Sequence, residues 1–410
     1  MIINFLVLVS VLFCFCGLAL DVGMVQLRKL QLQHAADAAA LGAMHEKARG
    51  NAGWVAAGKA DAALNGFTDG VNGVSISVVN PPTSGTYSGN MNAIQATVRQ
   101  NYHTAFLGMI TGSSSTSPGA SAVAAGSPNP DCVYIMGPGI TRYTLELTLN
   151  SGFYSSCNIY IDSVQSTIKD LNGSTLDANV SGSNSIKVQG ASGSGDVISG
   201  VAIPSPTFSS PNEADPLSSV TAPSFSSCDH YATVVILFGT LNPGTYCGGI
   251  TIMGAAVTFN PGLYIVTGGM TWELGSTING TGVTFYLTTG GGWTYGNFNI
   301  WNSTVTLSAP TTGSGGGVTG IVVFVDRNWL NNGFQGIQIL SSYVTTNGIW
   351  YALNTGIYNS SSTLRGTTYL GFVVDAIQGS AATFTIPAPD YSSLSGGSPF
   401  TAGSTISITQ

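Results

Sequence analysis

The stretch that decides the architecture of this chain is its N-terminal segment, Ile2–Leu20, IINFLVLVSVLFCFCGLAL, which contains no charged residue. It continues without a turn signal into 21–43, DVGMVQLRKLQLQHAADAAALGA, where apolar residues keep a helical spacing. An apolar run of this length measures roughly 28 Å as a helix, close to the ~30 Å hydrocarbon core of a bilayer. The sequence therefore predicts a long N-terminal helix, apolar at first and then a stalk, that enters a membrane or a bundle of like helices.

The flanks of the apolar run are unlike those of a secretory signal peptide. No basic residue precedes Ile2, and no cleavage site separates Leu20 from the helical pattern that follows. Membrane helices normally carry positive residues on their cytoplasmic side. We therefore expect Met1 to be the end left after a short basic leader is removed; a gene start placed too late is the alternative.

Two charged residues follow the apolar run on one helix face. Asp21 and Arg28 are seven residues, or about two turns, apart. An Asp at the membrane edge is costly unless it is paired, so a neighbouring copy could offer Arg28 or Lys29 to Asp21. Solvated charges at the interface are the alternative. We expect the helix to be buried by lipid or by other copies through the following residues: Ile2, Phe5, Leu6, Leu8, Val9, Leu12, Phe13, Leu18, Leu20, Asp21 and Arg28.

The segment 17–43 resembles the N-terminal signature of the TadE/TadG-like pilus-assembly family of bacterial tight-adherence pili. The resemblance is carried by Asp21 and Gly23, by Gln-Leu-Gln at 31–33, and by the alanine run 35–40 around Asp37. It implies insertion in the inner membrane, export of the C-terminal part, contact with the pilus-assembly machinery and a place in an extracellular filament.

The chain departs from the major type IV pilins at the start of its apolar run. Those pilins usually carry a glutamate there, whereas this chain has Asn4 and Phe5. The departure argues against assembly through a carboxylate that pairs with a neighbour's N-terminal amine.

Composition separates the rest of the chain from this helix. Charged residues make up only 7% of the 410 residues, 54 residues are glycine, and apolar residues reach 43%. This indicates a β-rich fold with a real core rather than a disordered segment. The net charge is −7, and no basic cluster exceeds Arg28-Lys29, which excludes a nucleic-acid-binding surface.

We expect an α+β chain with three regions. Region 1–66 is the apolar helix and stalk, 67–130 is a small α/β subdomain, and 131–410 is a surface domain. Helix is expected to continue over 44–66. The elements expected in the second region are strands at 74–79, 93–99 and 120–125, with a short helix at 103–110.

Recurring β-type runs in the third region predict a right-handed parallel β-helix. Offsets of about 18–28 residues correspond to the length of one solenoid coil, and stacked coils bury a continuous core without needing charge. An immunoglobulin-like sandwich would lack this spaced recurrence. The segment Pro243–Ile250, PGTYCGGI, also resembles the C-terminal half of some TadG-like proteins. The recurring runs are 243–246 and 261–264; 257–259, 283–285 and 305–307; and 320–324, 348–351 and 369–374.

Four cysteines lie in the polar part of the chain, and their spacings match no zinc or haem pattern. In an oxidising compartment, three pairings are open to them. We choose the pairs with the shorter loops, Cys132–Cys157 and Cys228–Cys247. Cys14 and Cys16 lie in the apolar run and are expected to behave as small apolar residues.

The chain shows no constellation typical of an enzyme. Glycoside hydrolysis needs two facing carboxylates, and Glu273, Asp326 and Asp375 are not at equivalent places on adjacent coils. Asp326-Arg327 is expected to be a turn with a local ion pair. No histidine pair in the polar part has ligand spacing, and no G-x-S-x-G elbow is present. The sequence therefore predicts no catalytic residue, no metal site and no cofactor.

Aromatic residues are the better binding candidates. Trp293, Tyr295 and Trp301 lie beside Asn and Thr and could stack on sugars, although stacking inside the β-helix core is the favoured alternative. The sequence thus supports first a pilin-like subunit, anchored in the inner membrane before it polymerises with copies of itself into an extracellular filament. The alternative is a membrane-anchored minor component or adhesin that binds glycans or surfaces.

Overall fold

A computed structural model describes 2–48, 53–90, 93–104, 106–108, 112, 114–125, 131–137, 143–162, 168–170, 173–180, 184–190, 197–198, 200–330, 336–391, 393–395, 398–400 and 407–409. The chain divides into two compact units. Unit 1 comprises Met1–Pro128 and Ser404–Gln410, and unit 2 comprises Asn129–Gly403.

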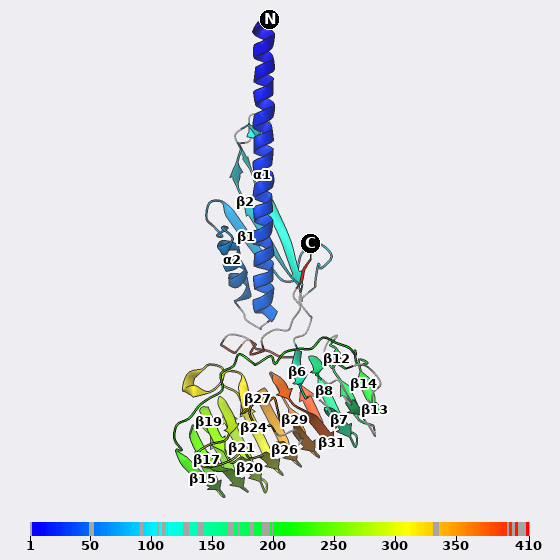
Figure 1. The fold of residues 1–410 in the computed structure, drawn as a ribbon, viewed down its shortest axis with the longest axis vertical. Helices are drawn as coiled ribbons and strands as arrows, with labels where there is room; N and C mark the ends of the chain where they lie inside the picture. The colour runs from blue at the N-terminus through cyan, green and yellow to red at the C-terminus, as the bar shows by residue number, and fades with distance from the viewer. Residues whose placement is uncertain are drawn as a thin grey trace. The chain divides into compact units, whose positions relative to one another are not determined.

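Unit 1 is a long helix packed with a small antiparallel sheet (Figure 1). Its helices are α1 (Ile2–Ala48) and α2 (Trp54–Leu64), so the helix expected over 44–66 is interrupted. The strands expected at 74–79, 93–99 and 120–125 are confirmed. At 103–110, His103 ends a short strand, and 105 and 109–110 lie outside the described residues. The sheet has the order β1 (Val74–Val79), β2 (Ala93–Gln100), β5 (Gly119–Ala125) and β33 (Ser407–Thr409), and a small hairpin joins β3 (Tyr102–His103) to β4 (Ser115–Thr116).

The alanine run of α1 forms a thin face that packs within unit 1. Its side chains are fully buried together with residues of β1, β2, β5 and α2. Gly58 of α2 permits the closest approach, since a Cβ there would lie 2.7 Å from the carbonyl oxygen of Ala39. The small side chains thus serve packing inside the chain. They are Ala35, Ala36, Ala39, Ala40 and Ala43.

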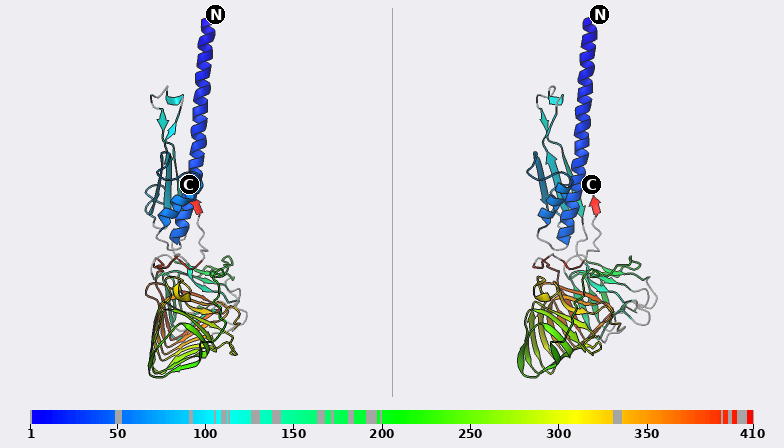
Figure 2. Two further views of the ribbon diagram at one scale, coloured as in Figure 1. Left: turned by 90° about the vertical axis from the view of Figure 1, so that its left-hand side faces the viewer. Right: turned by 60° about the vertical axis from the view of Figure 1, so that its left-hand side comes forward.

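Unit 2 contains a 27-stranded sheet in which the strands pair in parallel, so the large β-rich C-terminal domain expected from the sequence is confirmed (Figures 1 and 2). Its strands fall into three stacks, and one coil of chain contributes a strand to each. The first stack runs β15 (His230–Val235), β17 (Gly244–Met253), β19 (Gly262–Thr267), β22 (Val283–Thr288), β25 (Ile321–Val325), β27 (Tyr343–Ala352), β30 (Leu370–Val374), β6 (Asp131–Ile135), β9 (Asn158–Ile161) and β12 (Ile186–Val188).

The other two stacks keep the same coil order, and β15, β17 and β27 each continue into a second stack. The second stack runs β15, β17, β20 (Met270–Glu273), β23 (Phe298–Trp301), β26 (Ile337–Leu340), β28 (Ile357–Ser360), β31 (Ile377–Ser380), β7 (Leu145–Thr148), β10 (Ile168–Asp170) and β13 (Val197–Ile198). The third runs β16 (Phe238–Leu241), β18 (Ala256–Phe259), β21 (Thr277–Thr281), β24 (Thr304–Ser308), β27, β29 (Thr363–Arg365), β32 (Thr383–Ile386), β8 (Gly152–Ser155), β11 (Thr175–Asp177) and β14 (Val201–Ile203). A short 3-10 turn, η1 (Ser314–Gly316), joins β24 to β25.

The chain enters this structure in the middle rather than at one end. The first segment, β6–β14, builds the coils at one end, and a connector of residues 204–229 returns to the other end, where β15 begins (Figure 1). The second segment then builds toward the first, until β30, β31 and β32 pair in parallel with β6, β7 and β8. We call this junction the seam.

The recurring runs of the sequence only partly mark equivalent positions. Those that begin at Gly320, Gly348 and Tyr369 lie on neighbouring strands of the first stack. Val257, however, pairs with Ile278 in the third stack, whereas the matching run at Val283 lies in the first stack. Two strands from different stacks can therefore be as similar in sequence as two neighbouring strands of one stack.

A left-handed residue turns the chain between the second and third stacks in successive coils. A small buried residue follows it, and several such serines accept a hydrogen bond from the backbone of the preceding coil, as Ser362 does from Ser342 N at 2.8 Å. Glycine, asparagine and serine suit these turns because they tolerate or favour a positive φ. The turn residues are Gly254, Gly275, Asn302, Ser341, Ser361, Ala381, Asn150 and Gly173.

The core of unit 2 is a column of apolar side chains, and the unit also contains two disulfides. Trp272 and Trp350 are its largest fully buried members. The expected pairs Cys132–Cys157 and Cys228–Cys247 are both present, with Cα–Cα distances of 5.9 and 5.7 Å.

Candidate assembly surface on the N-terminal helix

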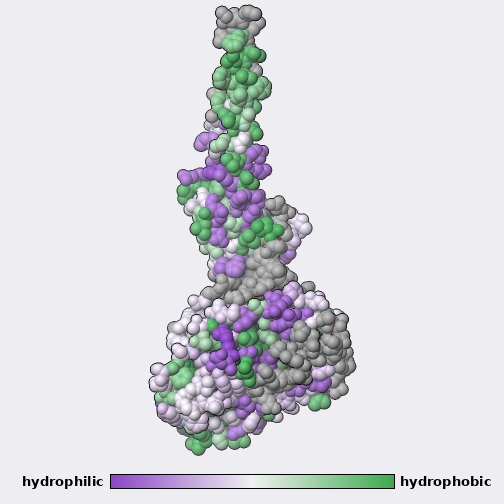
Figure 3. Space-filling view, viewed as in Figure 1, coloured by the Kyte–Doolittle hydropathy of each residue, from purple (hydrophilic) through white to green (hydrophobic). Residues whose placement is uncertain are grey.

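The N-terminal half of α1 presents large apolar side chains to solvent (Figure 3). Those of Phe5, Leu8, Leu12, Phe13 and Leu20 are 63–69% exposed. Val9 and Leu18 are half-buried, while the side chains of Ile2 and Leu6 lie outside the described residues. This half therefore contributes little to the core of unit 1.

The exposed residues lie on one broad face of the helix. At about 100° per residue, Phe5, Leu8, Leu12, Phe13 and Leu20 fall within an arc of roughly 140°. An apolar helix face of this width requires burial by other apolar surface. Phe15 belongs to the same set, and complete burial of a side chain of this size contributes about 1.5–3 kcal/mol. Covering the six residues, each about two-thirds exposed, therefore contributes on the order of 6–12 kcal/mol.

The boundary between this half and the packed half is set by Asp21. Its Oδ2 accepts hydrogen bonds from the backbone N–H groups of Phe106 and Leu107, each at 2.6 Å. The Phe106 ring lies over Gly17, where a Cβ would be 2.5 Å from the ring. In this structure the Asp21 carboxylate thus binds a loop of its own chain. Its pairing with a basic residue of another copy stays a prediction.

Arg28 is likewise engaged within unit 1. Its Nε donates to Gln100 Oε1 at 2.7 Å and its Nη1 to Gln31 Oε1 at 2.8 Å. The guanidinium also lies 5.0 Å from the centroid of the Phe67 ring. Asp21 and Arg28 thus fix the sheet and its hairpin to α1, and the apolar side chains remain the part of the expected site that is exposed.

No helix in the described part of the chain combines the length and the apolarity needed to cross a membrane. The membrane-spanning helix expected from the sequence is therefore not supported.

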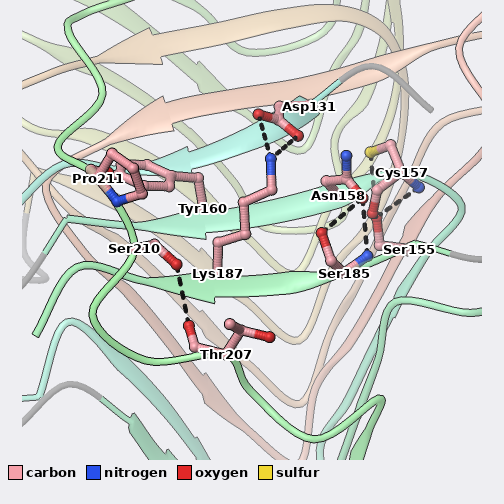
Figure 4. Close-up of polar contacts among 10 residues, drawn as sticks. All are labelled: Asp131, Ser155, Cys157, Asn158, Tyr160, Ser185, Lys187, Thr207, Ser210 and Pro211. Atoms are coloured by element: carbon pink, nitrogen blue, oxygen red, sulfur yellow. Dashed lines mark hydrogen bonds and ion pairs between the residues drawn. The ribbon is translucent and has the colours of Figure 1, made fainter. Parts of the chain in front are cut away.

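In unit 2, polar contacts gather where the connector begins (Figure 4). Thr207 pairs with Lys187 as one further step of the first stack, and Lys187 Nζ reaches the Asp131 carboxylate at 3.2 and 3.3 Å. Tyr160 Oη donates to the carbonyl oxygen of Pro211 and accepts from Glu213 N, at 3.0 and 2.8 Å. Burial raises the pKa of Tyr160 to about 12. These contacts hold the connector against the coils.

The carboxyl group of Glu213, in the connector, has a raised pKa. Burial raises its pKa, the nearby Asp131 raises it further, and Lys187 opposes part of the change. Its backbone N–H is already committed to Tyr160. The backbone of Glu213, rather than its carboxyl group, thus joins the connector to the coils.

A second anchor lies further along the connector. Arg327 Nη2 donates to the carbonyl oxygens of Leu217 and Val220 at 2.8 and 3.0 Å, and its Nε donates to Tyr351 Oη at 2.6 Å. Asp326 accepts from Thr288 Oγ1 at 2.6 Å. These contacts differ from the expected local ion pair between Asp326 and Arg327. Asp326 binds Thr288, and Arg327 binds the connector and Tyr351.

The three candidate aromatic residues differ in exposure. Trp293 is 44% exposed, in a turn that begins at Gly290. Tyr295 stacks on Trp329, with ring centroids 5.5 Å apart. Trp301 is half-buried, and its Nε1 has no hydrogen-bond partner within the described residues. Trp293 is thus the most accessible of the three.

Sequence reasoning missed the loop that binds Asp21 and the anchors of the connector. Gly17 was the available signal for the first, as a glycine in an otherwise bulky apolar helix. Nothing in the sequence connects Arg327 to the carbonyls of Leu217 and Val220, because these contacts span more than 100 residues. Within the described residues, no group of three or more His, Cys, Asp or Glu side chains could hold a metal ion.

Comparison with known proteins bears on the N-terminal segment. Residues 3–50 match the family model described as "Putative Flp pilus-assembly TadE/G-like". No curated protein and no solved structure matches the chain. The match implies involvement in pilus assembly, association with its machinery and a cell-surface or membrane-associated location. Over residues 3–50, the TadE/TadG-like resemblance predicted from the sequence is therefore confirmed.

Proposed function

We propose that the chain is a pilin-like structural subunit that polymerises through the apolar half of α1 into an extracellular filament. The observation that carries the proposal is the broad face of apolar side chains between Phe5 and Leu20, which a single copy leaves exposed. Burial between like helices removes this surface from water. The same segment lies within the residues that match the pilus-assembly family.

Further features fit a role as filament subunit. Asp21 is occupied by a loop of its own chain, so helix packing in this proposal relies on apolar contact rather than on ion pairs between copies. We infer that the three stacks of unit 2 form a right-handed parallel β-helix on the outside of the filament. We also propose a non-enzymatic role, with an inner-membrane stage before assembly.

The proposal is tested by placing a charge on the apolar half of α1. Leu12→Asp should remove the chain from sheared surface fibres, because a buried carboxylate without a partner is costly. Gln26→Asp is the matched control: it introduces the same charge at an exposed polar position of the same helix and should leave incorporation unchanged. The subunit role would be wrong if Leu12→Asp entered fibres as well as the wild type.

A second candidate is a minor pilus component or adhesin that binds glycans through unit 2. The exposed Trp293 ring favours it, since an accessible aromatic face can stack on a sugar ring. Glycan-array binding that is lost in Trp293→Ala and kept in Trp301→Ala would support this role. Fibres that consist mainly of this chain would argue against a minor component.

A further inference from the structure

The two end coils of unit 2 differ from the coils between them in one respect. Along the outward face of the third stack, one column of side chains pairs from strand to strand and is mainly small or hydroxyl-bearing. Apart from Tyr343, which is 41% exposed, this column carries large side chains only at its two ends, where Phe238 is 82% and Val201 is 49% exposed. The column is Phe238, Ala256, Thr277, Thr304, Tyr343, Thr363, Thr383, Gly152, Thr175 and Val201.

The next outward column ends in a similar way. It begins at the exposed Thr240 of β16 and finishes at Ile203 of β14, which is 41% exposed. Beside β16, Ile236 and Leu237 are 63% and 71% exposed. Both ends therefore carry apolar surface at the same face of the same stack.

The backbone at these ends is also available. In the described pairings, β16 has a partner on one side, β18, and β14 has one on one side, β11. Unpaired edge strands with apolar side chains and no charge are prone to pair with another chain. Residues 231–241 contain no charged side chain, and neither do 197–203.

The seam shows that coils of this chain stack without being consecutive in sequence. There, the last coil of the second segment meets the first coil of the first segment, with Phe372 opposite Val133 and Val374 opposite Ile135. All of β30 is buried at this junction. At the seam, the last coil of one segment pairs with the first coil of the other. The two free ends could pair in the same way, because β14 lies in the last coil of the first segment and β16 lies in the first coil of the second segment.

We propose that the β14 end of one copy docks on the β16 end of a second copy, so that the coils of unit 2 continue from subunit to subunit. In register with the columns above, Val201 would meet Phe238 and Ile203 would meet Thr240 of the next copy. Thr207 already adds one step to the first stack at this end, with hydrogen bonds of 2.8 Å to and from β12. A head-to-tail contact of this kind leaves both outer ends free and builds open chains rather than closed dimers. It does not depend on α1.

Site-directed cross-linking of the full-length chain tests the contact. The background is Cys14→Ser with Cys16→Ser, because these are the free cysteines of the described residues. With a short bismaleimide, the double variant Ile203→Cys/Thr240→Cys should give dimers, trimers and higher species, and each single variant should give none. The experiment is repeated with Leu12→Asp, so that failure of helix-driven assembly is distinguishable from failure of this contact.

Two further variants test the apolar surface itself. Phe238→Asp should lower the yield of cross-linked species at least about tenfold, because a charge replaces the most exposed aromatic of the end coil. Leu274→Asp is the matched control: Leu274 is 64% exposed but lies between β20 and β21, away from both ends, and its positive φ suits Asp. That variant should keep the ladder.

Three results would overturn the proposal. The first is the absence of a ladder in the double variant when both thiols react with a monofunctional maleimide. The second is dimer formation by Thr240→Cys alone, which would mean that two β16 ends face each other. The third is an equal ladder in the double-cysteine variant with and without Phe238→Asp.

Discussion

Removal of the Arg327 side chain should release the connector of unit 2. The guanidinium holds two connector carbonyls, those of Leu217 and Val220, and one side chain of the coils, Tyr351. Arg327→Ala removes all three hydrogen bonds, so that the carbonyl oxygens of Leu217 and Val220 lose their protein donor and must be hydrated instead. The Asp215 carboxylate lies 4.0 Å from Nε and accepts a hydrogen bond from Tyr351 Oη at 2.8 Å.

The size of the effect follows from the number of bonds and their exposure. A hydrogen bond from a charged donor contributes about 1.5–3 kcal/mol when buried. The Arg327 side chain is 27% exposed, so solvent recovers part of that loss. We expect the local stability of the connector to fall by about 2–4 kcal/mol, which corresponds to roughly a 30- to 1,000-fold larger open population.

Limited proteolysis reads this population directly, because cleavage tracks the open form when opening is fast relative to cleavage. Chymotryptic cleavage after Leu217 or Phe225 should rise at least about 30-fold in Arg327→Ala. Arg327→Lys should give an intermediate cleavage rate, because its ammonium group keeps the positive charge but lacks the planar set of donors that lets a guanidinium bind several acceptors at once.

Arg365 provides the matched control. It lies over the Tyr343 ring and makes one long hydrogen bond to Thr345 Oγ1, at 3.3 Å. Arg365→Ala should therefore change cleavage of the connector by less than about threefold. Equal cleavage in the two alanine variants would refute the assignment of Arg327 as an anchor.

Three further variants test the packing of each unit. Asp21→Ala leaves the N–H groups of Phe106 and Leu107 without their acceptor and should increase hydrogen exchange there at least about tenfold; unchanged exchange would contradict the contact. Gly58→Ala should destabilise unit 1 by about 1–3 kcal/mol despite the better helix propensity of alanine, and a rise in melting temperature would contradict the tight approach of α2. The pKa of Glu213 is raised on folding by burial, so its stabilising effect is present at acidic pH and is lost as pH rises through that pKa. Glu213→Gln should therefore be more stable than the wild type at neutral pH, with the difference vanishing below the ordinary Glu pKa of about 4.3; a difference independent of pH would contradict this cause.

Local patterns in the sequence were sufficient for the three long strands of unit 1. The strands at 74–79, 93–99 and 120–125 alternate apolar and polar residues, and this period of two is a property of the strand itself. The disulfide pairs were also predictable, since each joins cysteines that are close in sequence. The separate start of α2 after Gly53 was missed, although glycines in this region weaken a helix.

The coil order of unit 2 was not predictable from recurrence alone. Recurrent runs such as 257–259 and 283–285 mark similar strands, but they do not tell two stacks of one coil from two coils of one stack. The clearer repeat is the turn residue followed by a small buried residue, as in Gly275-Ser276 and Asn302-Ser303. Its members vary between Gly, Asn, Ser and Ala, because several residue types tolerate a positive φ.

The sequence by itself determined the long apolar helix, the pilus-assembly resemblance of its segment and the parallel β-rich character of the larger unit, because all three rest on residues near one another in the chain. The tertiary structure alone decided that Asp21 holds a loop of its own chain, that the β-segments meet at a seam, and that apolar surface remains at both ends of the coils. The first two of these features depend on pairs of residues 85 to more than 200 apart. Coils with similar apolar cores can stack in more than one order, and only the folded chain selects among those orders.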